Sequence, residues 1–188
     1  MCLILASSSP RRKKIFKDLG YSFQCISPDI DESNDGRLDS ISYVVRMSEN
    51  KARHVWDNNQ DSYILSGDTI VDFNSQIIGK PSSHNEAFEI LNKLSNKTHS
   101  VISGLTLFYK GRGTTIFDKT NVTFKKLSQS TIKDYINSFD VLDKAGAYNI
   151  EDAENILIKH IDGCYNNIVG FPLKKFKMSK IKKIIDTL

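Results

Sequence analysis

The amino-acid sequence predicts a mixed α/β fold, with one β-sheet and helices around it. Three observations support this class. Apolar runs typical of buried strands alternate with helical segments in the first half, two long β-rich runs follow each other in the second half, and glycine and proline fall singly between the segments. Alternation favours parallel pairing, whereas consecutive β-rich runs favour an antiparallel ribbon. A mixed sheet therefore fits better than a purely parallel, doubly wound sheet.

The first half combines strands with two helices, each predicted from apolar periodicity and from its end signals. We expect a strand at residues 2–6, a helix at 10–19 ended by Gly20, a strand near 21–26, a long helix from Ser40 through Trp56, short strands at 64–65 and 70–73 around Gly67-Asp68-Thr69, and a strand at 76–78 after a turn at Asn74-Ser75. These elements place Asp68 at the end of a strand.

The second half contains a helix, a ribbon and a basic tail. Ser83 and Glu86 have the spacing of a capping box, which predicts a helix that reaches Leu94. The other expected elements are β-rich runs at 98–109 and 114–125 around Gly111-Arg112-Gly113, a helix from Ser128, a strand at 156–158 and a basic helix from about Pro172. The paired β-rich runs predict the antiparallel part of the sheet.

Composition excludes several classes of protein. The chain has 188 residues, and 26 Lys and Arg against 22 Asp and Glu give a formal charge of +4. This surplus is too small for a dedicated nucleic-acid binder. No apolar run approaches the roughly 20 residues of a membrane span, and the beginning of the chain lacks the features of a signal peptide. We therefore expect no stable nucleic-acid complex and no membrane association.

Cysteine and histidine spacing disfavours further classes of protein. The three cysteines are far apart and form no C-x-x-C pair, which favours a reducing cytoplasm over a disulfide framework. The four histidines lack the spacing of a zinc site, and the sequence has neither a G-x-S-x-G elbow nor a phosphate loop. A hydrolase of the triad or Walker type is disfavoured.

The start of the first helix has the features of an anion site. Ser9 is a suitable N-cap and Pro10 a suitable first residue, but the first turn then carries Arg11, Arg12 and two lysines. Acidic side chains usually occupy this position, because the helix N-terminus carries a partial positive charge. Backbone N–H groups, serine hydroxyls and guanidinium groups together suit phosphate oxygens. A solvated basic helix with an ordinary serine cap accounts for the same residues, and the spacing leaves both interpretations open.

Carboxylates that could share a divalent cation lie elsewhere in the first half. Asp29, Asp31, Glu32 and Asp35 crowd one loop, and Asp68 follows a strand. Mg²⁺ uses one or two such oxygens together with water and substrate phosphate, and Asp68 could also accept a proton from an attacking water. A solvated acidic loop and a turn-forming aspartate are the alternatives. Lys51 and Lys80 could each reach a phosphate, although single lysines are usually solvated.

Taken together and in this order, these segments resemble the Maf family of nucleoside triphosphate pyrophosphatases, once described as septum-formation inhibitors. The matching stretches cover nearly the whole chain and lie at 3–12, 28–32, 51–52, 67–69, 79–81, 142–148 and 167–173. A match of this extent is far more specific than any single motif and favours the anion-site interpretation.

The resemblance implies one domain over residues 1–188, with the fold of the inosine triphosphate pyrophosphatase superfamily: an elongated mixed sheet, two lobes and a central cleft. It implies hydrolysis of nucleoside triphosphates to monophosphate and pyrophosphate with Mg²⁺ or Mn²⁺. Asp68 matches the family's proton acceptor, and Glu32 matches the acidic position beside the metal. The phosphate-binding positions match Ser7, Ser9, Arg11, Arg12, Lys51 and Lys80. Family members are often dimers, so the resemblance admits a homodimer.

The same resemblance also indicates which nucleotide base the substrate carries. Arg11 and Thr69 match the branch of the family that acts on dTTP and UTP, and Glu151 stands where that branch usually has glutamine. An ionised carboxylate can only accept a hydrogen bond, whereas an amide can also donate. The resemblance therefore implies dTTP, UTP or their modified forms as substrates and marks Glu151 as a departure.

Two other functions remain open from the sequence. A non-catalytic nucleotide- or nucleic-acid-binding regulator of cell division is the first, and the family's older name favours it. The basic tail carries apolar residues at helical spacing, and such a helix can bind membranes or acidic partners. A terminal helix packed on the core, with its lysines in solvent, is the simpler interpretation of the tail.

Overall fold

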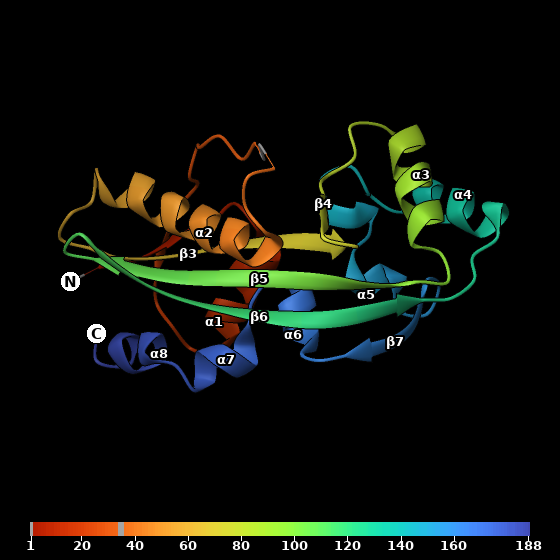
Figure 1. The fold of residues 1–188 in the computed structure, drawn as a ribbon. Helices are drawn as coiled ribbons and strands as arrows, with labels where there is room; N and C mark the ends of the chain where they lie inside the picture. The colour runs from red at the N-terminus through yellow and green to blue at the C-terminus, as the bar shows by residue number, and fades with distance from the viewer. Residues whose placement is uncertain (1, 34–35) are drawn as a thin grey trace.

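A seven-stranded sheet runs along the molecule in a computed structural model that describes residues 2–33 and 36–188 (Figure 1). The strands are β1 (Leu3–Ala6), β2 (Gln24–Ile26), β3 (Tyr63–Phe73), β4 (Gln76–Ile78), β5 (Thr98–Tyr109), β6 (Arg112–Phe124) and β7 (Ile158–Asp162). Their order in space is β2-β1-β3-β5-β6-β7, and β4 pairs with β3 beside this row.

The sheet changes from parallel to antiparallel pairing at β3. Strands β2, β1 and β3 are parallel neighbours, whereas β3 pairs antiparallel with β4 and β5, β5 with β6, and β6 with β7. Helical connections lead to the parallel strands, and tight turns join β3 to β4 and β5 to β6. The predicted mixed α/β class is confirmed.

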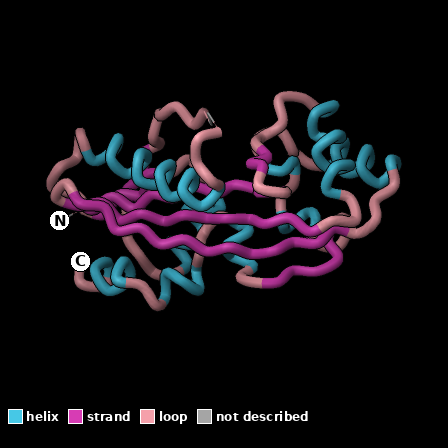
Figure 2. Tube along the Cα trace, in the orientation of Figure 1, coloured by secondary structure: helices cyan, strands magenta, loops and turns pink. Residues whose placement is uncertain are grey.

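Helices cover both faces of the sheet (Figures 1 and 2). They are α1 (Pro10–Asp18), α2 (Ser40–Trp56), α3 (His84–Leu94), α4 (Gln129–Ser138), the 3-10 turn η1 (Ala145–Ala147), α5 (Ile150–Ala153), α6 (Tyr165–Val169), α7 (Leu173–Lys177) and α8 (Lys180–Ile185). Helix α2 packs on β3 and β5 from one side, while α6, α7 and α8 contact β5 or β6 from the other. Because β5 and β6 are long, they connect the two ends of the molecule.

Separate apolar clusters stabilise the two ends. The largest contains Leu91, Phe124 and Tyr135 and lies with α3, α4 and α5 at one end. At the other end, Phe16, Phe171 and Phe176 form a cluster under β1 and β3, and residues of α2 pack on the opposite face. This arrangement matches the two lobes that the family resemblance implied.

Serine caps fix three of the predicted helix starts. Ser9, Ser83 and Ser128 each accept a hydrogen bond from the backbone N–H three residues further along the chain. Such caps satisfy one of the donors that a helix leaves free at its N-terminus.

The prediction of two short strands around Gly67-Asp68-Thr69 is wrong. Residues 63–73 form the single strand β3, because β5 pairs with it without interruption from Ile64 to Asp72. Glycine suits position 67 of this strand because there is no room for a side chain: an added Cβ would lie 2.9 Å from both the Arg12 Nε and the Gly104 carbonyl oxygen. Asp68 therefore lies inside a strand rather than at its end.

Three other boundaries differ most from the prediction. The second strand is only Gln24–Ile26. The last strand begins at Ile158, because α5 and the turn after it take up the preceding residues. The basic tail forms two helices instead of one, since Ser179 caps α8 and separates it from α7.

The apolar face of the tail lies in the core. Phe176, Ile181 and Ile185 are buried in the cluster with Phe16, and the tail's lysines are mostly exposed. The simpler interpretation of the tail is confirmed. Among the described residues, no helix combines the length and apolar character needed to cross a membrane.

Candidate active site

The pocket opens at a break in the pairing along one edge of β3. On this edge β1 pairs as far as Ser66, and β4 begins to pair at Val71. In the described part of the chain, residues 67–70 have no strand partner on that edge. A cavity of about 560 Å³ lies there, between the two lobes. Its volume falls within the usual range for small-molecule sites.

Neighbouring residues of β3 reach the pocket from opposite faces of the sheet. Successive side chains of a strand point to opposite sides. The Asp68 carboxylate lies on the side of α2, where it contacts Lys51, and the Thr69 hydroxyl lies on the side of Arg12 and Gly170. The pocket therefore has a carboxylate side and a guanidinium side.

Lys51 joins two carboxylates on the first side. Its Nζ lies 2.6 Å from Asp68 Oδ1 and 3.0 Å from Glu32 Oε1. Lys51 and Asp68 are largely buried, with side-chain exposures of 11% and 8%, whereas Glu32 is half exposed at 48%. The hydroxyl of Tyr43 donates to the Glu32 carbonyl at 2.6 Å, which anchors the acidic loop on α2. Burial, together with the negative charges of Asp68 and Glu32, raises the pKa of Tyr43 to about 12.

Arg12 is buried under the other side. Its Nη1 donates to Ser7 Oγ at 2.7 Å, and its Nε donates to the Gly170 carbonyl at 3.0 Å. A longer bond of 3.4 Å joins its Nη2 to Thr69 Oγ1. Burial lowers the pKa of Arg12, and the charge of Asp68 opposes this shift. The guanidinium thus ties the start of α1 to β3 and to the end of α6.

The β1–α1 loop supplies hydroxyl groups. Ser7 Oγ accepts from the Arg12 guanidinium and from the Ser9 backbone N–H at 3.2 Å, which leaves the Ser7 hydrogen for an acceptor in the pocket. Ser9 caps α1, whose first turn contains no acidic residue. This end of the pocket can donate several hydrogen bonds to an anion.

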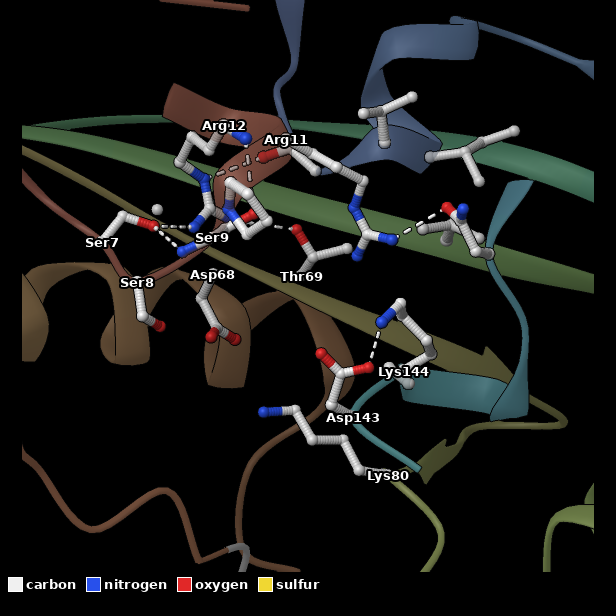
Figure 3. Close-up of a pocket in the computed structure, with 18 of the residues that line it drawn as sticks. Ser7, Ser8, Ser9, Arg11, Arg12, Asp68, Thr69, Lys80, Asp143 and Lys144 are labelled. Atoms are coloured by element: carbon white, nitrogen blue, oxygen red, sulfur yellow. Dashed lines mark hydrogen bonds and ion pairs between the residues drawn. The ribbon is translucent and has the colours of Figure 1, made fainter. Parts of the chain in front are cut away.

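Arg11 lies at the opposite end, near α5. Its Nη1 donates to Asn149 Oδ1 at 2.8 Å, and Asn149 Nδ2 in turn donates to Asp152 Oδ2 at 2.9 Å. Glu151, in the first turn of α5, also lines this region. Lys80 and the ion pair of Lys144 with Asp143 complete the wall, and Figure 3 shows these three side chains pointing toward the space beside Asp68.

A family model described as Maf-like protein matches residues 2–179. The chain belongs to the Maf family.

Two curated relatives of this Maf chain have the same name. A protein of Bacillus cereus named dTTP/UTP pyrophosphatase is 39% identical over 173 residues, which cover 92% of this chain and 91% of that one. One of Clostridium botulinum with the same name is 43% identical over 179 residues, covering 92% of both chains.

Two solved structures are also similar to the Maf chain. The first, a nucleoside-triphosphatase / dITP/XTP pyrophosphatase from Mycobacterium abscessus, has a TM-score of 0.46 at 11% identity and covers 83% of this chain and 93% of its own. The second, the Ham1 protein of Staphylococcus aureus, has a TM-score of 0.45 at 14% identity and covers 66% of this chain and 72% of its own.

The pocket of this Maf chain brings together residues that are far apart in the sequence. All the candidate site residues line it: Ser7, Ser9, Arg11, Arg12, Glu32, Lys51, Asp68, Thr69, Lys80 and Glu151. Asp29 and Asp31 of the acidic loop do not belong to the lining, and Asp35 lies outside the described residues. The acidic loop thus contributes Glu32 rather than its whole cluster.

Several residues that line the pocket had no predicted role. Lys144 and Asn149 flank the Ala-Gly-Ala turn, in which Gly146 and Ala147 have positive φ. The Gly146 N–H donates to the Gly79 carbonyl at 3.1 Å, which holds this turn against the loop of Lys80. The compact small-residue segment at 143–148 was the available signal, but its spacing did not reveal a role.

Proposed function

We propose that this chain is a nucleoside triphosphate pyrophosphatase that hydrolyses dTTP and UTP, or modified forms of them, to the monophosphate and pyrophosphate. One observation carries the proposal. Two carboxylates, Asp68 and Glu32, both contact the ammonium of Lys51. They lie in the same pocket as the helix N-terminus and the guanidinium groups of α1. A site with both negatively and positively charged side chains suits a polyanion that binds together with a metal ion. The names of the relatives support the choice of substrate.

The phosphate chain is proposed to bind along the start of α1. Ser7 keeps a hydroxyl hydrogen for a phosphate oxygen, and the first turn of α1 adds backbone N–H groups. Arg12 uses three of its five N–H groups on protein partners, so it both holds the loop and adds charge. Lys80 and Arg11 extend the positive lining away from this end.

Glu32 and Asp68 are the residues that would hold the divalent cation, Mg²⁺ or Mn²⁺. The donor set fits a hard cation, which takes carboxylate oxygens and keeps water and substrate phosphate as its other ligands. The two side chains already flank one positive group, the ammonium of Lys51. In the described ranges no cluster of three or more His, Cys, Asp or Glu could hold a metal, so phosphate and water would complete the coordination. When bound, the cation neutralises phosphate charge and polarises water.

Asp68 is proposed to accept the proton of the attacking water. The water oxygen forms a bond to the α-phosphorus, the bond from that phosphorus to the α–β bridging oxygen breaks, and pyrophosphate leaves with the bond electrons. Lys51 holds the Asp68 carboxylate in place at 2.6 Å. Arg11, Arg12 and Lys80 stabilise the negative charge that moves to the leaving group, and such electrostatic stabilisation usually dominates phosphoryl transfer.

The nucleoside is proposed to lie toward Thr69 and Glu151. Both line the pocket, and Thr69 lies on the face of β3 opposite to Asp68 and Lys51. Arg11, which is bonded to Asn149 just before α5, also lines the pocket. We also propose that residues 1–188 act as one domain in the cytoplasm, where the three free cysteines would stay reduced. A homodimer is proposed from the family resemblance, and sedimentation of the full chain tests it.

A nucleotide panel with Mg²⁺ tests the activity. We expect pyrophosphate from dTTP and UTP, and a loss of about 10²–10⁴-fold in Asp68→Asn, which removes the proton acceptor but keeps the side-chain size. Glu151→Gln, assayed on the same nucleotides, tests the part of the pocket that is proposed to bind the base. Release of inorganic phosphate in place of pyrophosphate, or equal rates for wild type and Asp68→Asn, contradicts the proposal.

A further inference from the structure

A line of hydrogen bonds leads from the pocket to a buried turn behind it. Arg12 Nη2 lies 3.4 Å from Thr69 Oγ1, and Thr69 Oγ1 lies 2.8 Å from Ser103 Oγ on the neighbouring strand β5. Ser103 Oγ lies 2.7 Å from the carbonyl oxygen of Asn167 in α6. Ser103 and Asn167 are fully buried, whereas Thr69 is partly exposed in the pocket.

The last bond fixes the direction of all the others. A carbonyl can only accept, so the single hydroxyl hydrogen of Ser103 is committed to Asn167. The Ser103 oxygen must then accept from Thr69, which commits the only hydroxyl hydrogen of Thr69. Arg12 donates to one Thr69 lone pair. Toward the pocket, Thr69 offers its remaining lone pair and acts as an acceptor alone.

This polarity decides which part of a nucleotide can bind at Thr69. Ionised phosphate oxygens also accept only, so a phosphate gains no hydrogen bond there. Ser7 differs, because it accepts from two protein donors and keeps its hydrogen for a ligand. The group that faces Thr69 must therefore carry a donor, and Thr69 lies on the face of β3 opposite to Asp68 and Lys51.

We propose that Ser103 is a positioning residue that makes Thr69 an obligate acceptor, so that the site selects the N3–H of uracil or thymine. Cytosine carries a lone pair at N3, which would face the lone pair of the Thr69 hydroxyl oxygen and form no hydrogen bond with it. The inference rests on the proposed function and deepens it. One matched hydrogen bond corresponds to a preference of about tenfold for UTP over CTP.

Pyrophosphate release from UTP, CTP and 3-methyl-UTP tests the proposal. Wild type is expected to have a kcat/KM about tenfold or more lower for CTP and for 3-methyl-UTP, whose N3 cannot donate. In Ser103→Ala the Thr69 hydroxyl is free to turn and donate to cytosine N3, so the UTP/CTP ratio falls about tenfold. Ser100→Ala is the matched control on β5, because its hydroxyl donates to Asn121 at 2.9 Å outside the pocket, and its ratio stays at the wild-type value.

Two outcomes overturn the proposal. One is a wild type that cleaves 3-methyl-UTP as fast as UTP, and this arm needs no variant, so it decides the matter even if Ser103→Ala does not fold. The other is a folded, active Ser103→Ala with an unchanged UTP/CTP ratio. If wild type releases no pyrophosphate from any nucleotide, the proposed function itself fails and this inference fails with it.

Discussion

The burial of His99 predicts that mild acid destabilises the protein. It lies on β5 with 2% of its surface exposed, and its Nε2 is 2.8 Å from the Tyr148 hydroxyl. Within the described structure its Nδ1 has no hydrogen-bond partner, and the ring of Phe124 packs on it at 4.9 Å between centroids. Burial lowers the pKa of His99 from 6.5 to about 4.

The direction of the effect follows from proton binding in the two states. Below about pH 6.5 the unfolded chain takes up a proton at His99, but the folded chain does not until about pH 4. The contribution to the free energy of unfolding is therefore fully present above pH 6.5 and lost as the pH falls toward 4. At 1.36 kcal/mol for each pH unit between the two pKa values, the loss is about 3 kcal/mol.

Urea unfolding at pH 7, 5.5 and 4 measures this loss. His99→Gln, which cannot take up a proton, is expected to lose about 3 kcal/mol less than wild type between pH 7 and pH 4. His54→Gln, on the exposed side of α2, is the control and should follow wild type. If His99→Gln loses stability as steeply as wild type, the assignment of the acid sensitivity to His99 is refuted.

Three further substitutions test the packing of the site and the core. Gly67→Ala places a Cβ 2.9 Å from Arg12 Nε, so we expect about 1–3 kcal/mol of destabilisation with loss of activity, while Gly79→Ala, which meets nothing within 4 Å, is tolerated. Lys51→Met leaves the Asp68 carboxylate without its cation and should lower the free energy of unfolding by about 3 kcal/mol. Phe176→Ala empties a fully buried position and should cost about 3–5 kcal/mol in urea unfolding.

Local signals in the sequence were sufficient for most of the helices. Caps such as Ser9 and Ser128 act within one turn, and the structure confirms the helices that they begin. The short helices α5 and α6 have four and five residues, too few for a helical period to be recognised. The continuity of β3 depends on pairing with β5, from Ile64 opposite Phe108 to Asp72 opposite Ser100. These partners lie far apart in the sequence, so a local pattern could not show the pairing.

The candidate site shows the same difference between local signals and contacts of distant residues. The residue types at the start of the first helix indicated an anion site, and the family resemblance extended it to the other segments. Neither showed that Lys51 lies between Asp68 and Glu32, because that contact depends on how α2 packs on β3. The bond from Arg12 to Gly170 spans 158 positions and likewise exists only in the folded chain.

Hydrolysis of UTP in ¹⁸O-labelled water is the most direct test of the central claim, attack of water on the α-phosphorus beside Asp68. The labelled oxygen goes to the phosphorus that is attacked, and mass spectrometry of both products locates it. The label is predicted to appear in UMP while pyrophosphate stays unlabelled. Label in pyrophosphate, with none in UMP, would mean attack on the β-phosphorus and would contradict the account.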